Sequence, residues 1–140
     1  MDKCDGDLSE YVDNLDVIEA PVCHALLIQA ADGLSYLHSN KIVHRDIKAN
    51  NMLLVKKMPF PTLKLTDFSF AKDLEGKDSY MSTVRGNAHW MAPELLTTAG
   101  HHDKSAYFKS PVDVFAMGLI YIFICLNKKG MKIFKDIQSE

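Results

Sequence analysis

The apolar run VFAMGLIYIFICL, from Val114 to Leu126, constrains the fold more than any other segment of the chain. It is too short to cross a bilayer as a helix, which takes about 20 apolar residues, so a membrane anchor is disfavoured. Pro111 and Asp113 stand just before it, as is typical of a helix start. A helix that is apolar all round is normally buried. The run therefore predicts a fully buried helix in a globular core.

A second helix is predicted from Pro21 to about Ser39, because proline suits the first turn of a helix. Apolar residues recur within it at helical spacing, namely Val22, Leu26, Ala30, Leu34 and Leu37. Gly33 in the same stretch costs up to about 1 kcal/mol relative to alanine. A glycine retained at that cost suggests close packing against another element.

Three short strands are predicted after this helix, at Ile42–Val43, Met52–Val55 and Leu63–Thr66. The segment Lys56–Thr62 contains Pro59 and Pro61, so it must be a connection. The polar stretch 44–51 then lies on a loop between two strands, and Asp67 follows the third strand. Loops supported by strands are a usual location for catalytic groups.

Composition narrows the class of protein. A chain of 140 residues fits one domain or part of a larger one, and its hydrophobic fraction of 47% is enough for a core. The net charge of −2 argues against nucleic acid as an obligate partner. Cys4, Cys23 and Cys125 form neither a zinc motif nor a disulfide framework, which indicates a reducing cytosol and a cytoplasmic location. The acidic, polar N-terminus shows no signal peptide.

Three polar blocks follow one another along the chain: HRDIKANN from His44 to Asn51, Asp67-Phe68-Ser69, and Ala92-Pro93-Glu94. A carboxylate such as that of Asp46 can accept the proton of a hydroxyl group. Lys48 adds a cation two residues further on. Asn51 and Asp67 offer oxygen atoms, which are the ligands that Mg²⁺ prefers.

In this order and at this spacing, the three blocks resemble the catalytic machinery of eukaryotic protein kinases. DFSFAK and WMAPELL are similar to the serine/threonine branch, and in places to the autophagy-initiating kinases. The resemblance covers about Met1 to Leu126. It implies a protein kinase-like α+β fold of which residues 1–140 form a partial domain. That part would be the C-terminal lobe, mainly helical with short strands around the catalytic loop. The N-terminal lobe would precede Met1, and the last helices of the C-terminal lobe would be absent.

The resemblance also implies the chemical roles. Asp46 would orient and deprotonate a protein hydroxyl, and Lys48 would stabilise the phosphate during its transfer from ATP. Asn51 and Asp67 would hold Mg²⁺. His44 and Phe68 would be packing residues that anchor the catalytic loop, together with Asp113, to the long buried helix.

Near the hinge between the lobes, the resemblance assigns three further residues to the nucleotide. Asp7 would face the ribose or a substrate side chain. Leu8 and Leu53 would sandwich the adenine ring from below. These assignments predict that the segment around residue 7 lies close to the strand that contains Leu53.

A regulatory site is also implied. Thr83 lies three residues before Gly86, where many kinases carry an activating phosphothreonine. A phosphate there would pair with Arg45 and Lys72 and order the loop. The alternative is an exposed loop hydroxyl without a regulatory role.

Two departures from the family pattern, Ser69 and Asn87, and the missing N-terminal lobe favour a rival function. Ser69 replaces a glycine, Asn87 replaces a threonine or serine, and Glu94 lacks its usual arginine partner, so it would be solvated or mispaired. We expect a serine/threonine protein kinase, with the isolated chain inactive because it contains no glycine-rich loop. The alternative is a pseudokinase or a truncated, non-catalytic protein-binding module.

Overall fold

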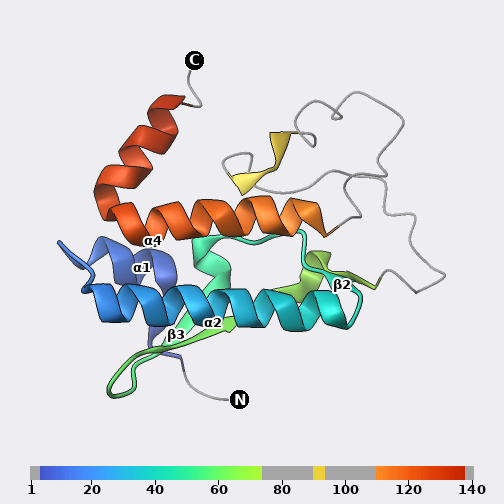
Figure 1. The fold of residues 1–140 in the computed structure, drawn as a ribbon, viewed down its shortest axis with the longest axis horizontal. Helices are drawn as coiled ribbons and strands as arrows, with labels where there is room; N and C mark the ends of the chain where they lie inside the picture. Colours follow the sequence, from blue (N-terminus) through green and yellow to red (C-terminus); the bar gives the residue numbers. More distant parts are fainter. Residues whose placement is uncertain (1–3, 74–89, 94–109, 138–140) are drawn as a thin grey trace.

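The computed structural model describes residues 4–73, 90–93 and 110–137 (Figure 1). The helices are α1 (Leu8–Asp13), α2 (Ala20–Ser39) and α4 (Pro111–Ile137). The strands are β1 (Gly6–Asp7), β2 (Ile42–Val43), β3 (Met52–Val55), β4 (Thr62–Leu65) and β5 (Lys72–Asp73), and 3₁₀ turns cover Ala49–Asn51 and Phe68–Phe70. The predicted mainly helical architecture with short strands is confirmed.

Helices α2 and α4 lie side by side and run antiparallel across the molecule (Figure 1). The Tyr121 hydroxyl donates to the carbonyl oxygen of Leu27 at 3.0 Å. Nearer the end of α2, His38 Nε2 lies 2.9 Å from Asp113 Oδ2. Later residues of α2 therefore meet earlier residues of α4, and the two helices form the framework on which the loops rest.

The main core lies between these helices, α1 and one face of β3. Its fully buried members include Leu8, Val12, Leu26, Ala30, Met52 and Ile120. The predicted apolar stripe of α2 is confirmed, since Leu26, Ala30, Leu34 and Leu37 are all buried. Pro21 stands in the first turn of α2, also as predicted.

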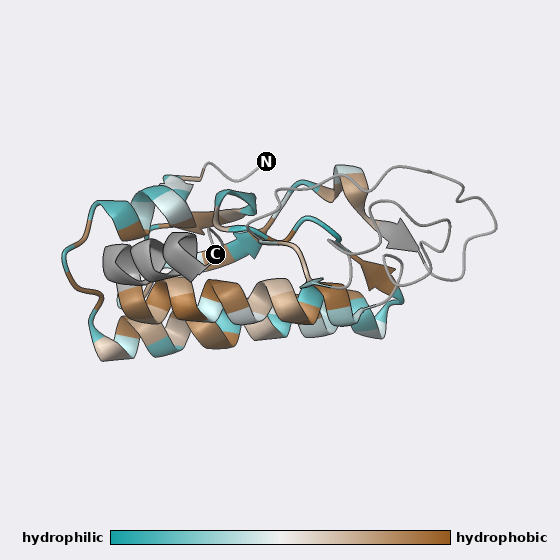
Figure 2. Ribbon diagram, turned by 90° about the horizontal axis from the view of Figure 1, so that it is seen from above, coloured by the Kyte–Doolittle hydropathy of each residue, from teal (hydrophilic) through white to brown (hydrophobic). Residues whose placement is uncertain are grey.

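Helix α4 differs from its prediction in length and in burial. It begins at Pro111 and continues to Ile137, well beyond the apolar run. Its apolar first part is conspicuous in Figure 2. Only one face is buried, because Val114 is 58% exposed and Leu126 is 46% exposed, with no described element covering them. No helix within the described ranges is both long enough and apolar enough to cross a membrane.

Two small antiparallel sheets support the polar loops. The first has the strand order β1-β3-β4, and Met52 pairs with Leu65 in its register. The second pairs β2 with β5. Strand β4 begins at Thr62 and ends at Leu65, one residue earlier at each end than predicted.

Helix α2 is joined to β4 by one polar side chain and one close contact. Gln29 donates to the carbonyl oxygen of Pro61 at 3.0 Å and accepts from the backbone N–H of Leu63 at 2.9 Å. A Cβ atom at Gly33 would lie 3.3 Å from Leu65 Cδ1. The close packing predicted at Gly33 is therefore confirmed.

Candidate active site

Asp113, in the first turn of α4, holds the backbone of the loop that follows β2. Its carboxylate is buried, and it accepts hydrogen bonds at 2.8 Å from the backbone N–H groups of both His44 and Arg45. Arg45 has a φ of 67°, in the left-handed region that residues other than glycine seldom adopt. The two hydrogen bonds stabilise this strained backbone, so α4 determines where the loop lies.

His44 connects this loop to the one that contains Asp67. Its ring is completely buried, and Nε2 lies 3.0 Å from the carbonyl oxygen of Thr66. The ring centroids of His44 and Phe68 are 5.0 Å apart, at a tilt of 51°. His44 therefore links the loops after β2 and β4 through one aromatic pair and one hydrogen bond.

The side chains of Lys48 and Asn51 converge on the carboxylate of Asp46. Asp46 is 6% exposed, and its Oδ2 accepts from Lys48 Nζ at 2.7 Å and from Asn51 Nδ2 at 2.8 Å. Asn51 Nδ2 also donates to the Asp46 carbonyl oxygen at 2.9 Å. Within the described residues, Asp46 Oδ1 makes no hydrogen bond. A buried carboxylate oxygen with a vacant acceptor site is suited to receive a proton from a hydroxyl group.

Asp67 lies beside this cluster because the backbone joins the two loops. The N–H of Thr66 donates to the carbonyl oxygen of Asn51 at 3.0 Å. Asp67 is the next residue after Thr66, so this bond holds it near Asn51. Asp67 is exposed and has a φ of 61°, a left-handed conformation that aspartate tolerates better than most residues.

The Asp67 carboxylate is engaged by its own loop. Its Oδ1 accepts from the Ser69 hydroxyl at 2.5 Å and from the Ser69 N–H at 3.3 Å. These two hydrogen bonds, the hydroxyl first, hold the pKa of Asp67 below its usual value, with smaller contributions from the nearby Lys48 and His44. Asp67 is therefore a carboxylate that prefers its charged form.

The donor atoms of Asn51 and Asp67 fit a hard divalent cation. The Asn51 amide nitrogen donates to Asp46, whereas its Oδ1 accepts no hydrogen bond from the described residues. An amide oxygen and a charged carboxylate are ligands that Mg²⁺ accepts, with water or phosphate oxygens completing its shell. In the described part of the chain, no three His, Cys, Asp or Glu side chains gather into a metal site made by protein alone.

The residues assigned to the nucleotide lie on the first sheet. Asp7 pairs with Leu53 in the register of β1 and β3. Asp7 caps α1 by accepting from the Glu10 N–H at 2.8 Å, and its other oxygen accepts from Asn50 Nδ2 at 3.2 Å. Leu8 is fully buried in the core, whereas Leu53 is half-buried. Of the two leucines assigned to the adenine ring, Leu53 is therefore the one with exposed surface.

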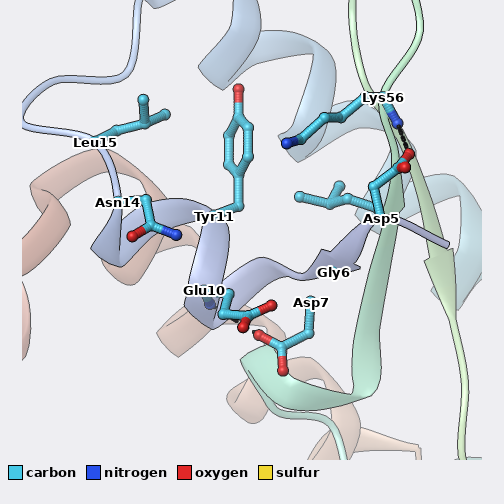
Figure 3. A pocket seen from close by; sticks show the side chains of 9 residues that line it. Asp5, Gly6, Asp7, Glu10, Tyr11, Asn14, Leu15 and Lys56 are labelled. Atoms are coloured by element: carbon cyan, nitrogen blue, oxygen red, sulfur yellow. Dashed lines mark hydrogen bonds between the residues drawn. The ribbon is translucent and has the colours of Figure 1, made fainter.

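A pocket lies beside β1 and α1 (Figure 3). It is lined by Asp5, Gly6, Asp7, Glu10, Tyr11, Asn14, Leu15, Leu54 and Lys56. Its polar groups are mainly acidic, and one of them, Asp5, accepts from the backbone N–H of Lys56 at 2.8 Å. Because Asp7 lines this pocket and also bonds Asn50, the pocket adjoins the polar loop.

The residues assigned to regulation are described only in part. Arg45 Nε donates to the carbonyl oxygen of Phe70. The backbone of Lys72 pairs with Val43, which brings the start of β5 next to the loop. Thr83 lies outside the described residues, as do Asn87 and Glu94. Of the third block, Ala92 is buried with Val43 and Val112.

Sequence reasoning missed two residues that organise the site. His38 contacts Asp113 and thereby supports the loop from α2. Gln29 holds β4, which leads to Asp67. In the sequence, each of these residues is a polar side chain within the predicted apolar helix. This pattern suggests that the side chain has a partner, but it does not identify the partner.

The chain is similar in sequence to known protein kinases. The family model described as the protein kinase domain matches residues 1–139. The probable serine/threonine-protein kinase fhkC of Dictyostelium discoideum is 35% identical over 136 residues, covering 96% of this chain and 21% of that protein. The serine/threonine-protein kinase shk1/pak1 of Schizosaccharomyces pombe is 38% identical over 117 residues, covering 84% of this chain and 16% of that protein.

A solved structure agrees with the sequence relatives. One chain in the crystal structure of the yeast RNA Pol II CTD kinase CTDK-1 complex superimposes with a TM-score of 0.70 and 29% identity. The match covers 88% of this chain and 38% of that chain. The present chain therefore spans only a small part of the curated relatives that it matches, and less than half of this structural neighbour.

Proposed function

The chain belongs to the protein kinase family, and from this premise we propose that it carries the catalytic loop of a serine/threonine protein kinase. The reaction is transfer of the γ-phosphoryl group of ATP to a hydroxyl group of a protein. Two observations support the serine/threonine branch: the relatives at 35% and 38% identity are serine/threonine-protein kinases, and Lys48 stands two residues after Asp46.

The single observation that carries the proposal is the convergence of Lys48 and Asn51 on Asp46. With Oδ2 held by these two donors, the carboxylate plane has little freedom to rotate. Asp46 Oδ1 then orients the substrate hydroxyl and accepts its proton. Lys48 keeps a positive charge next to the carboxylate and stabilises negative charge on the transferring group.

Asn51 and Asp67 are the residues that would hold Mg²⁺. Magnesium-bound ATP supplies the phosphoryl group and neutralises part of its charge. The bond between the Thr66 N–H and the Asn51 carbonyl keeps the two ligand loops adjacent before any ligand binds. Leu53 offers an apolar surface for adenine, and Asp7 an acceptor for the ribose or a substrate side chain.

Regulation by phosphorylation of Thr83 is part of the same proposal. Arg45 immediately precedes Asp46, so a phosphate that binds Arg45 acts on the catalytic loop directly. The Arg45 guanidinium already donates to the carbonyl oxygen of Phe70, at the start of the segment that leads toward Thr83. A reducing, cytoplasmic location belongs to this proposal as well.

One observation favours the second candidate, a pseudokinase or another non-catalytic binding module. The Ser69 hydroxyl occupies Oδ1 of Asp67, and family members with glycine at that position lack this hydroxyl. If Ser69 retains the carboxylate, Asp67 has one oxygen fewer for a cation. The chain would then act through protein contacts alone.

Two substitutions test the catalytic proposal. Turnover is measured with the full-length product of the gene, and binding of magnesium-ATP by calorimetry on the same protein. Asp46→Asn should abolish turnover and leave nucleotide affinity nearly unchanged, whereas Asp67→Asn should also weaken magnesium-dependent binding.

Asp32→Asn, an exposed carboxylate on α2, is the matched control and should change neither quantity. Equal effects of Asp46→Asn and Asp67→Asn on ATP affinity would contradict the assigned roles. Wild-type protein that binds no nucleotide would favour the binding module.

A further inference from the structure

Two thiols from different helices face each other at one end of the helix pair. Cys23 Sγ in α2 lies 3.7 Å from Cys125 Sγ in α4, and neither is in a disulfide. The two residues are far apart in sequence, so only the antiparallel packing of α2 and α4 brings them together. This contact lies outside the candidate active site, and no step of the proposed phosphoryl transfer uses it.

The contact is supported by a fixed register between the helices. Leu27 follows Cys23 by one helical turn, and Tyr121 precedes Cys125 by one turn, so each lies on the same face as its cysteine. The Tyr121 hydroxyl donates to the Leu27 carbonyl oxygen at 3.0 Å. This bond keeps the two helices from sliding at the turn next to the thiols, and the thiols stay opposite each other.

The separation of the sulfur atoms is close to what a disulfide requires. A disulfide bond is about 2.05 Å long, so the sulfurs must approach by roughly 1.7 Å from their separation of 3.7 Å. Rotation of the two side chains and a small shift of the two helices can supply this movement. A metal site is disfavoured, because no third His, Cys, Asp or Glu side chain joins the pair among the described residues.

We propose that Cys23 and Cys125 are a redox modification site, in which a peroxide converts the two thiols into a reversible disulfide that joins α2 to α4. The Cys125 thiolate attacks one oxygen of hydrogen peroxide, forming a sulfenic acid and releasing hydroxide, which takes up a proton. The Cys23 thiolate then attacks the sulfenic sulfur, the S–S bond forms, and hydroxide leaves and takes up a proton to become the second water. Two thiols lose two electrons in total, and one peroxide becomes two waters.

The environments of the two thiols fit this order of events. Cys125 is exposed, so peroxide reaches it directly, whereas Cys23 is half-buried. Burial raises the pKa of the Cys23 thiol, and the adjacent Cys125 raises it further. Cys23 is therefore the poorer thiol for attack on peroxide, and proximity to Cys125 makes it the resolving partner.

The disulfide would act on the fold through the helix pair. Helices α2 and α4 also meet at His38 and Asp113, where the backbone of the loop with Asp46 is held. A covalent bond at the other end of the pair restricts their separation, and a cross-link between distant residues also restricts the unfolded chain. We therefore expect the oxidised chain to unfold at a higher urea concentration than the reduced chain.

The test oxidises the reduced chain with one equivalent of hydrogen peroxide and counts thiols with a chromogenic reagent. The Cys4→Ser chain should lose both of its remaining thiols and two hydrogen atoms in mass, and a reductant should restore both. The bond is mapped by digestion with trypsin and Glu-C, since cleavage after Glu19 separates Cys4 from Cys23. The expected product links the peptide 20–41 to the peptide 110–128.

Single variants test the order of events. In Cys23→Ser the sulfenic acid on Cys125 should persist and be trapped by dimedone, whereas Cys125→Ser should give little trapped product. The wild-type mapping does not depend on either variant folding. A disulfide that involves Cys4, a disulfide between two chains, or oxidation that leaves Cys23 and Cys125 unlinked would each overturn the proposal. A linked chain with an unchanged urea midpoint would overturn its effect on the fold.

Discussion

His38 Nε2 lies 2.9 Å from Oδ2 of Asp113, so the last turn of α2 meets the first turn of α4 through one polar contact. The two positions suit the helix dipoles, because an acidic side chain is favourable near a helix N-terminus and a basic one near a C-terminus. The same Asp113 carboxylate receives the backbone N–H groups of His44 and Arg45. One buried side chain therefore joins both long helices to the loop that contains Asp46.

Replacement of Asp113 by alanine should strongly destabilise the chain. It leaves two buried backbone N–H groups without an acceptor, at about 1–3 kcal/mol each. We expect the free energy of unfolding, measured by urea denaturation, to fall by about 3 kcal/mol or more. Asp113→Asn keeps one oxygen acceptor and the same volume, so its loss should be clearly smaller. A change within about 0.5 kcal/mol for the alanine variant, as for an ordinary surface site, would show that the loop does not depend on this carboxylate.

His38→Ala should have a smaller effect than the change at Asp113. It removes one hydrogen bond, a loss of about 1 kcal/mol, and leaves both loop N–H groups bonded. His38→Gln, which can still donate to Asp113, should recover part of that loss. Ser35→Ala is the control, because this exposed side chain lies on the same helix one turn away. Urea denaturation that ranks the alanine and glutamine variants equal would argue against a donor role for His38.

Ser69→Ala should raise the pKa of Asp67 toward its usual value, since the hydroxyl is the main cause of the lowered pKa. A carboxyl group whose pKa is lower in the folded state stabilises that state at pH values above the unfolded pKa. This stabilisation is lost as the pH falls through the folded pKa. The Ser69 hydroxyl should therefore stabilise the folded state at neutral pH and not in acid. Titration of the Asp67 carboxyl by NMR measures the shift directly, and an unchanged pKa in the variant would contradict the geometry.

Gln29→Ala should loosen the attachment of β4 to α2. The change removes the acceptor of the Leu63 N–H and the donor to the Pro61 carbonyl, a loss of about 2 kcal/mol for two hydrogen bonds. Hydrogen exchange of the Leu63 amide should become faster. Gln29→Met keeps the shape and should show the same faster exchange, whereas His24→Ala, an exposed site on α2, should not. If the Leu63 amide exchanges as slowly in both Gln29 variants as in the wild type, Gln29 does not attach β4 to α2.

Local patterns predicted α2, α4, β2, β3 and β4, whereas α1, β1 and β5 were not predicted. The apolar spacing from Leu26 to Leu37 is enough to identify α2, because a helix places every third or fourth residue on one face. The strands at Ile42–Val43 and Met52–Val55 agree residue for residue with their predictions. The prediction of full burial for α4 was wrong, because composition reports how apolar a helix is and not how many of its faces find a partner.

The sequence by itself determined the two long helices, three of the short strands and the chemical groups of the candidate site, since these depend on residue type and on near neighbours. Only the tertiary structure decided which distant groups meet: Asp113 with His38 and the loop N–H groups, Gln29 with β4, and Cys23 with Cys125. These contacts join residues whose separation in the chain bears no relation to a helical or strand period. They follow from the register in which α2 packs on α4 and on β4, and that register is set by the shapes of many buried side chains acting together.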